Sequence, residues 1–304
     1  MTPHTIPIWN AWWKTLGLLF LMLGKAKSKL QGYSRARPFG TQEIARCVDY
    51  DIKVVDEWIG VLADYTGSGE DSVRGARILE LGPGADLGAA LYLLSKGAGR
   101  YCTVDAYPLA LQASAEIHEA MVAEIARRGS AISVGELRQA LASAQNRKID
   151  ESAIRYVVRP DFEFADAFGR ESFDLVFSQA AFEHFDDVEH VIRQVTQVTR
   201  PGGRLIAGVD LQTHARWLRE KDPLNIYRFS EHTYRLLGFR SMPNRVRPSD
   251  YERILRKYNW ERIEFRNVAS VDEAYFERVR SALDPAFRSD ETKQLWIVVC
   301  ATRT

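Results

Sequence analysis

Cysteine is scarce in this sequence, and an excess of one charge is missing. Cys47, Cys102 and Cys300 lie far apart and form no CxxC pair, so a disulfide framework and a thiolate zinc site are excluded. Such a set favours a reducing compartment, the cytoplasm. The 41 Lys and Arg residues nearly balance 40 Asp and Glu residues, for a net charge of +1. Because nucleic-acid-binding proteins carry a clear basic excess, we expect no nucleic-acid partner.

A long uninterrupted hydrophobic run is also absent. The most apolar stretch, residues 6–24, contains Asn10 and Lys14, whereas a membrane span needs about 20 predominantly apolar residues. A secretory signal would carry its positive charges before the apolar run, but here lysines follow it. Two interpretations remain open: a helix lying at the inner face of a membrane with its tryptophans at headgroup level, or a helix docked on the protein body or on a second copy.

The remaining sequence shows short apolar strands that alternate with amphipathic helices. Strands are expected at residues 77–81, 101–105, 156–158, 162–164, 173–178 and 205–209, with helices from Thr41 to about residue 62, at 86–95, at about 109–128 and at 187–199. This alternation predicts an α/β fold, a doubly wound and mostly parallel sheet of Rossmann-like type. Residues 1–40 would form an apolar helix and a basic linker (25–40), and residues 41–304 one domain with a cofactor core at 74–211. An acceptor-side segment (212–258) and edge strands within 259–304 would complete it.

The turn after the first strand reads Glu80-Leu-Gly-Pro-Gly-Ala-Asp-Leu-Gly88. Glycines at such a turn allow a tight bend and let a ligand approach the backbone. A dinucleotide fingerprint needs a small residue where Leu87 stands, and Asp86 would repel a pyrophosphate. The turn therefore favours a cofactor without phosphate and with a cationic amino-acid end, such as S-adenosylmethionine.

Two further acidic residues are candidates for the same cofactor. Asp105 ends the second strand, where its carboxylate can accept hydrogen bonds from both hydroxyls of a ribose. Asp166, followed by Ala167 and Phe168, can accept from the amine of adenine while an aromatic ring packs on the base.

Four segments resemble the class I S-adenosylmethionine-dependent methyltransferases: ILELGPGADLG (78–88), TVDAYP (103–108), ADAFGRESFDLVFSQAAFEHF (165–185) and RPGGRLIAG (200–208). The nearest variety is the small-molecule group with an EH dipeptide after strand four. The resemblance covers about residues 74–211. It implies that Glu80, Gly82 and Gly84 line the methionine end of the cofactor, Asp105 the ribose, and Asp166 with Ala167 the adenine.

That EH dipeptide, Glu183-His184, is the candidate catalytic element. It follows a strand that ends at the edge where open α/β sheets bind ligands, and His184 has a side chain suited to a general base. The alternative is a histidine that only holds its loop. Some relatives with an E-x-x-E-H arrangement bind a metal there, but Ala180 replaces the first acid, so we predict no metal site. Further acceptor-side candidates are His214, Trp217, Tyr227, His232, Tyr234 and Arg245.

These observations predict a methyltransferase that uses S-adenosylmethionine on a small-molecule, glycan or lipid-linked acceptor, most simply at oxygen. Methyl transfer is an in-line displacement, so the protein mainly positions the acceptor and excludes water. Two alternatives remain: a catalytically silent cofactor-binding regulator or partner subunit, and an NAD-dependent oxidoreductase, which Asp86 and Leu87 disfavour. Membrane contact or self-association through residues 6–24 is expected of the first segment.

Overall fold

The central element is a seven-stranded sheet in the order β3-β2-β1-β4-β5-β7-β6. The computed structural model describes residues 6–31, 43–145, 153–170, 172–239 and 242–304. Five strands are parallel: β1 (Arg77–Leu81), β2 (Arg100–Asp105), β3 (Ile154–Val158), β4 (Phe173–Gln179) and β5 (Thr199–Asp210). At one edge β7 (Gln294–Arg303) runs antiparallel to β5, and β6 (Trp260–Ser270) antiparallel to β7. The predicted mostly parallel, doubly wound sheet is confirmed.

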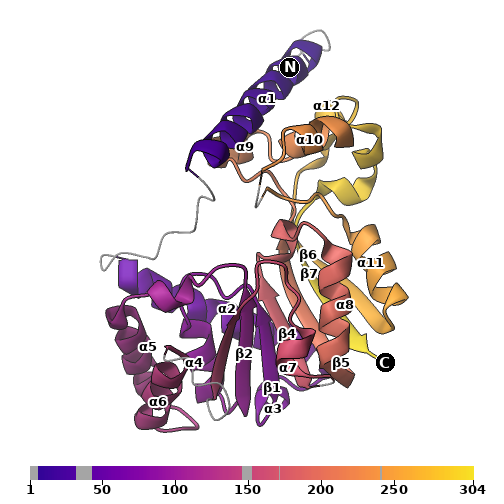
Figure 1. Cartoon of the computed structure of the whole chain (residues 1–304). Helices are drawn as coiled ribbons and strands as arrows, with labels where there is room; N and C mark the ends of the chain where they lie inside the picture. The colour runs from indigo at the N-terminus through magenta and orange to yellow at the C-terminus, as the bar shows by residue number, and fades with distance from the viewer. Residues whose placement is uncertain (1–5, 32–42, 146–152, 171, 240–241) are drawn as a thin grey trace.

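Helices cover both faces of this sheet (Figure 1). One face packs on α2 (Ile44–Thr66), α4 (Gly88–Ser95), α5 (Ala115–Arg128) and α6 (Val134–Gln145), and the other on α7 (Ala165–Phe168), α8 (Val188–Val198) and α11 (Pro248–Lys257). Because side chains alternate along a strand, Ile78 joins the α2 side while Leu79 and Leu81 join the α8 side. Glu80 therefore points toward α2, a placement that matters for the site.

Several boundaries differ from the sequence prediction. Residues 162–164 form no strand, because the Phe164 and Ala165 amides donate to Gln194 Oε1 and Phe162 has a φ of 52°. The helix expected over 109–128 is divided into η2 (Ala110–Gln112) and α5, since Ser114 is extended. The expected linker at 25–40 is helical up to residue 31, and residues 32–40, with Thr41 as helix cap, lie outside the described residues.

A third apolar cluster lies beyond the sheet, around α1 (Ile6–Gln31). The elements packed there are η4 (Asn225–Arg228), α10 (Glu231–Leu236) and α12 (Glu273–Arg280), with α9 (Arg216–Lys221) alongside (Figure 1). The other short elements are α3 (Glu70–Val73), η3 (Phe182–His184), η5 (Pro285–Phe287) and η6 (Asp290–Lys293). We call the assembly of α1, α9, η4, α10 and α12 the cap.

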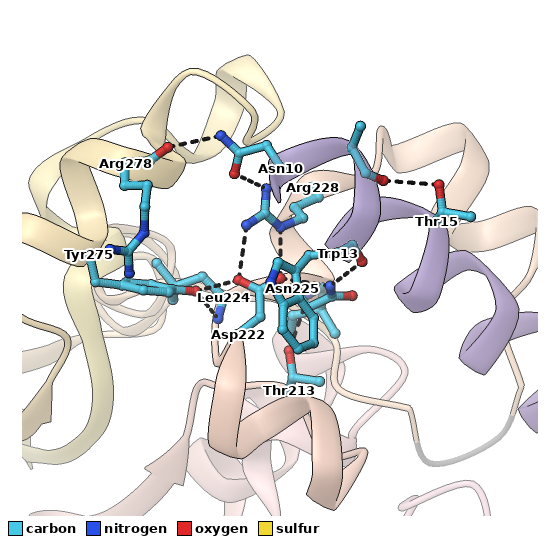
Figure 2. A network of polar contacts seen from close by, with 12 residues as sticks. Asn10, Trp13, Thr15, Thr213, Asp222, Leu224, Asn225, Arg228, Tyr275 and Arg278 are labelled. Atoms are coloured by element: carbon cyan, nitrogen blue, oxygen red, sulfur yellow. Dashed lines mark hydrogen bonds and ion pairs between the residues drawn. The ribbon is translucent and has the colours of Figure 1, made fainter. Parts of the chain in front are cut away.

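A buried ion pair holds the cap together (Figure 2). Arg228 donates from Nε to Asp222 Oδ2 at 2.8 Å and from NH2 to Oδ1 at 3.0 Å, and neither side chain is exposed. Tyr275 and Asn225 also donate to this carboxylate. Asn10 of α1 accepts from Arg228 NH1 at 2.9 Å, so the helix is tied directly to the pair.

The inner face of α1 is therefore docked on the protein body, one of the two interpretations left open by the sequence. Trp13 and Leu21 are buried there, and the Trp13 carbonyl accepts from Asn225 Nδ2 at 2.8 Å. Gly17 lies so close to Asn225 that a Cβ would stand 1.9 Å from its Oδ1. Among the described residues, no helix has the length and apolar character needed to cross a membrane.

The buried pair predicts a large stability effect. Asp222→Ala leaves the Arg228 guanidinium buried without its counter-charge, so the free energy of unfolding should fall by about 3–5 kcal/mol. Urea unfolding followed by circular dichroism measures the change. The matched control is Lys53→Ala, which breaks an exposed pair with Glu57 and should cost at most about 1 kcal/mol. Equal losses in both variants would contradict the structural role of the pair.

Candidate active site

A cavity of about 520 Å³ opens beside the carboxyl ends of β1, β2 and β4. This is the edge at which open α/β sheets bind ligands, and the volume is that of a small-molecule site. Its lining residues are Gly82, Gly84, Asp105, Ala106, Tyr107, Leu109, Pro160, Asp161, Phe162, Glu163, Ala180, Ala181, His184, Phe185, Asp186, Asp187, His190 and Val191.

The turn after β1 exposes bare backbone to this cavity. Gly82 and Gly84 have φ angles of 72° and 80°, a left-handed conformation that favours glycine. A Cβ at Gly82 would stand 2.7 Å from Ala181, whereas one at Gly84 would meet no heavy atom within 4 Å. The backbone at Gly84 is thus open to a ligand, as the sequence predicted for this turn.

Asp105 stands at the end of β2, in the wall of the cavity. The carboxylate accepts from the Tyr107 amide at 3.1 Å, and 9% of the residue is exposed. Burial raises the pKa of Asp105 to about 6, and hydrogen bonds from the amides of Tyr107, Ala106 and Gly84 offset part of the rise. The carboxylate is therefore ionised at neutral pH and placed to accept from hydroxyl groups.

The charged residues that line the cavity are mainly acidic. The acidic lining residues are Asp105, Asp161, Glu163, Asp186 and Asp187, and no lysine or arginine is among the described residues that line it. Arg193 approaches Glu163 from outside the lining, at 3.9 Å. An anionic ligand such as a pyrophosphate would be repelled here, whereas a cation would be attracted.

Three more carboxyl groups lie behind the glycine turn, on the α2 side of β1. Glu80 accepts from the Tyr101 hydroxyl, and Asp86 Oδ1 accepts from the Gly88 amide at 2.8 Å. Asp51 of α2 approaches so closely that a Cβ on Gly88 would stand 2.0 Å from its Oδ2, an oxygen without a hydrogen-bond partner. Gly88 therefore makes room for this carboxyl group.

Two of these acids, Asp51 and Glu80, hold their protons more tightly than isolated carboxyl groups do. Burial raises the pKa of Asp51 to about 10, and the nearby carboxyl groups of Asp86 and Glu80 raise it further. Burial likewise raises the pKa of Glu80 to about 8, while the Tyr101 hydroxyl lowers it in part. A cation arriving at the turn would relieve this crowding of negative charge.

The predicted site residues are only partly brought together. Gly82, Gly84, Asp105 and His184 line the cavity, and Glu80 and Asp86 lie behind its glycine turn. Asp166 is exposed on α7, and Ala167 lines a separate hollow, so the structure does not place this pair at the cavity.

Sequence reasoning missed two residues just after β3 that line the cavity. Asp161 and Phe162 line the cavity instead, and the Phe162 ring packs edge-on against Phe185 at 4.6 Å between centroids. Their position just after β3 was a usable signal, because strand ends meet at this edge. Asp51 offered no such signal, since its helix is brought over the turn only by folding.

A second polar cluster adjoins the cavity at η3. His184 packs against His214 with ring centroids 4.8 Å apart, and both oxygens of buried Glu183 have no hydrogen-bond partner. Burial raises the pKa of Glu183 to about 8. Burial, aided by the charges of His184 and Arg219, lowers the pKa of His214 to about 3, so the His214 ring is neutral at physiological pH.

One atom of each of these three side chains lies within 4.8 Å of the others, and such donors could hold a transition metal. The sequence prediction of no metal counted only Glu183 and His184, and it stays a prediction now that His214 supplies a third donor.

The other acceptor-side candidates have different surroundings. Arg245 donates to the Phe229 carbonyl at 2.7 Å and lies over the Tyr234 ring at 4.0 Å. The Tyr227 hydroxyl donates to the Leu211 carbonyl. Trp217 and His232 are exposed. Of the six candidates, His214 is the one that meets the Glu183-His184 pair.

Comparison with known proteins finds similarity to methyltransferases. Residues 118–207 match the family described as a methyltransferase domain. The 27-O-demethylrifamycin SV methyltransferase of Amycolatopsis mediterranei is 36% identical over 84 residues, 26% of this chain. The match spans 28% of the length of that relative. The matched segment indicates a methyltransferase domain over residues 118–207 of this chain.

Two solved structures to which this chain is similar are described as methyltransferases. An S-adenosylmethionine-dependent methyltransferase of Mesorhizobium loti has a TM-score of 0.41 and 17% identity, covering 76% of this chain and 93% of its own. Phosphoethanolamine N-methyltransferase 2 of Haemonchus contortus, in complex with phosphomonomethylethanolamine and S-adenosylhomocysteine, has a TM-score of 0.45 and 15% identity. The similarity covers 91% of this chain and 56% of the Haemonchus contortus chain.

The raised pKa of Asp51 predicts a pH-dependent stability effect. The native state holds this proton up to about pH 10 but the unfolded chain only to about pH 4, so burial of Asp51 becomes more destabilising as pH rises between these values. Asp51→Asn should therefore increase the free energy of unfolding of the ligand-free protein at neutral pH by at least about 1 kcal/mol. Its melting temperature should rise accordingly. Differential scanning calorimetry across this range measures it.

Asp56→Asn is the control, because Asp56 lies on the exposed side of the same helix and should not change the melting temperature. A gain for Asp51→Asn that is the same at acidic and alkaline pH would contradict the electrostatic explanation.

Proposed function

We propose that this protein transfers the methyl group of S-adenosylmethionine to a small-molecule or glycan acceptor, at an oxygen atom. The observation that carries the proposal is the composition of the cavity, whose described lining has five carboxyl groups and no lysine or arginine. A sulfonium cofactor with an ammonium group and no phosphate suits such a lining, whereas the pyrophosphate of NAD does not. The oxidoreductase alternative is disfavoured for this reason.

The residues around the glycine turn fit this cofactor. Asp105 would accept from the ribose hydroxyls, and the open backbone at Gly84 would lie beside the methionine portion. Asp51, Glu80 and Asp86 lie behind that turn, where an arriving ammonium group would lower the raised pKa values of Asp51 and Glu80 and so favour their negatively charged forms. When bound, the cofactor supplies a methyl group activated by its sulfonium, and the protein has to position the acceptor and exclude water.

We propose Asp161 and Phe162 for the adenine, in place of the Asp166 and Ala167 that the resemblance implied. The requirement is unchanged: a carboxylate accepts from the exocyclic amine while an aromatic ring packs on the base. Asp161 and Phe162 meet it inside the cavity, with Phe185 supporting the ring of Phe162.

We propose His184 as the group that takes the proton of the acceptor. The side chain lines the cavity, and the neutral His214 ring and the carboxyl group of Glu183 lie beside it. An imidazolium formed at His184 would be stabilised by a Glu183 carboxylate, which becomes easier to ionise as that positive charge forms. The cluster can therefore receive a proton without a free charge remaining in the site.

The surroundings of His214 support an acceptor with an apolar portion. A cavity of about 100 Å³ adjoins His214 beneath α1, and Gly17, Phe20, Leu21 and Phe239 are among its lining residues. Such a lining favours a hydrocarbon group over a sugar. A lipid-linked acceptor, with its reactive hydroxyl at His184 and its apolar end toward α1, satisfies both cavities.

The role of Asp105 can be tested by calorimetry. Asp105→Ala should weaken S-adenosylmethionine binding by about 10- to 100-fold, the loss of hydrogen bonds to a charged group. Asp166→Ala is the matched control and should change affinity less than about 2-fold, because Asp166 is exposed outside the cavity. If Asp166→Ala weakened binding and Asp105→Ala did not, the result would support Asp166 at the adenine, as the resemblance implied. It would also contradict a contact between Asp105 and the ribose.

Turnover tests the catalytic role of His184. His184→Ala should lower the rate of S-adenosylhomocysteine release by about 10²- to 10⁴-fold, the usual contribution of a general base, while cofactor affinity changes little. His232→Ala, at an exposed position of the cap, is the control. Cofactor binding with no S-adenosylhomocysteine release from any acceptor extract would instead support the silent regulator.

A further inference from the structure

The outer face of α1 is the most apolar exposed surface in the described part of the chain. Seven of the eleven large hydrophobic residues exposed there belong to this helix. The exposed residues that form the stripe opposite the buried Trp13 and Leu21 recur at helical spacing: Ile8, Trp12, Thr15, Leu19, Met22, Leu23, Ala26 and Leu30. We call this set the outer stripe.

The one polar member of the outer stripe is satisfied within the helix. Thr15 Oγ1 donates to the Ala11 carbonyl at 2.9 Å, so its hydroxyl needs no water. Phe20 adjoins the stripe and stacks on exposed Trp217 of α9 at 6.2 Å, which extends the apolar surface onto the cap. Isolated exposed apolar residues are ordinary, but a contiguous surface of this kind marks an interaction site.

The charge of α1 distinguishes between the surfaces that could cover it. The helix contains four lysines, at positions 14, 25, 27 and 29, and no Asp or Glu. In a dimer formed through this face, two such helices would bring eight positive charges together without acidic partners on either helix. A bilayer with anionic lipids attracts the same lysines, and each one near the surface contributes about 1 kcal/mol.

The attachment of α1 makes it a rigid part of the molecule. Asn10 and the Trp13 carbonyl bind the Arg228 and Asn225 side chains, and Lys25 donates to the Leu236 carbonyl. Figure 1 shows α1 lying along the other helices of the cap, which stand between α1 and the sheet. A surface that contacted the outer stripe would therefore hold the whole enzyme in a defined orientation.

We propose that α1 is an interfacial membrane helix, which inserts the outer stripe into the headgroup region of a bilayer and binds anionic lipids through its lysines. The helix would lie in the plane of the membrane without crossing it, as helices with one apolar face and basic flanks do. This inference depends on the surface of α1 and does not require methyl transfer. It would explain why the apolar cavity beside His214 lies directly under the helix.

Sedimentation of the full chain with vesicles tests the proposal. We expect binding to vesicles of phosphatidylcholine mixed with phosphatidylglycerol, and weaker binding to phosphatidylcholine alone. The double variant Leu19→Glu, Leu23→Glu should lose at least about 100-fold in partitioning, because it places two charges in the stripe. Lys27→Gln with Lys29→Gln should lose about 20- to 30-fold with the anionic vesicles only.

Val268→Glu, at an exposed apolar position on β6, is the matched control and should bind vesicles like the unchanged protein. Melting curves and calorimetric affinity for S-adenosylmethionine should be unchanged in the stripe variants, since the altered side chains are exposed. Vesicle binding that survives Leu19→Glu, Leu23→Glu would overturn the proposal. A second outcome would also overturn it: the unchanged protein does not bind vesicles and forms a dimer in light scattering, and these changes convert the dimer to a monomer. That result would assign the outer stripe to contact with a second copy.

Discussion

Crowding of buried carboxyl groups at the carboxyl ends of β1 and β2 is the constraint on which this site depends. Asp51, Glu80 and Asp86 crowd behind the glycine turn, and Asp105 stands in front of it, with pKa values raised by burial for Asp51, Glu80 and Asp105. Such an arrangement reduces the stability of the ligand-free protein, because buried carboxyl groups lose solvation without gaining a counter-charge. It is favourable only when a cation enters, which ties cofactor binding to the stability of the turn.

The buried charges of the cap, in contrast, are paired within the chain. Asp222 and Arg228 are more deeply buried than the carboxyl groups of the site, yet they are matched in charge and hydrogen-bonded to each other. One buried set of charges is thus satisfied by the chain itself and specifies how α1 docks, whereas the other is left for a ligand. The two sets of buried charges differ in whether the chain supplies the counter-charge. The cap network has its counter-charge within the protein, whereas the carboxyl groups around the glycine turn do not.

Local pattern was enough to predict most of the elements but not all of their ends. Apolar spacing located α2 and α8, because the same side chains that set the period are those buried in the core. It failed at 162–164, where the side chain of Gln194, thirty residues away from Phe164, takes the backbone donors that a strand would use. The helix predicted at 109–128 is interrupted because Ser114 is extended, a backbone conformation that apolar spacing does not reveal.

The sequence by itself determined the Rossmann-like sheet, the glycine turn with Asp105 at the next strand end, and a cofactor without phosphate. Each of these depends on residues that are close in the chain or on strand ends that must meet at one edge. Only the tertiary structure decided that Asp51 completes the acid cluster, that His214 joins Glu183 and His184, and that one face of α1 is docked while the other is exposed. Those relations join segments distant in sequence, and they arise from packing of helices and loops, which no local period encodes.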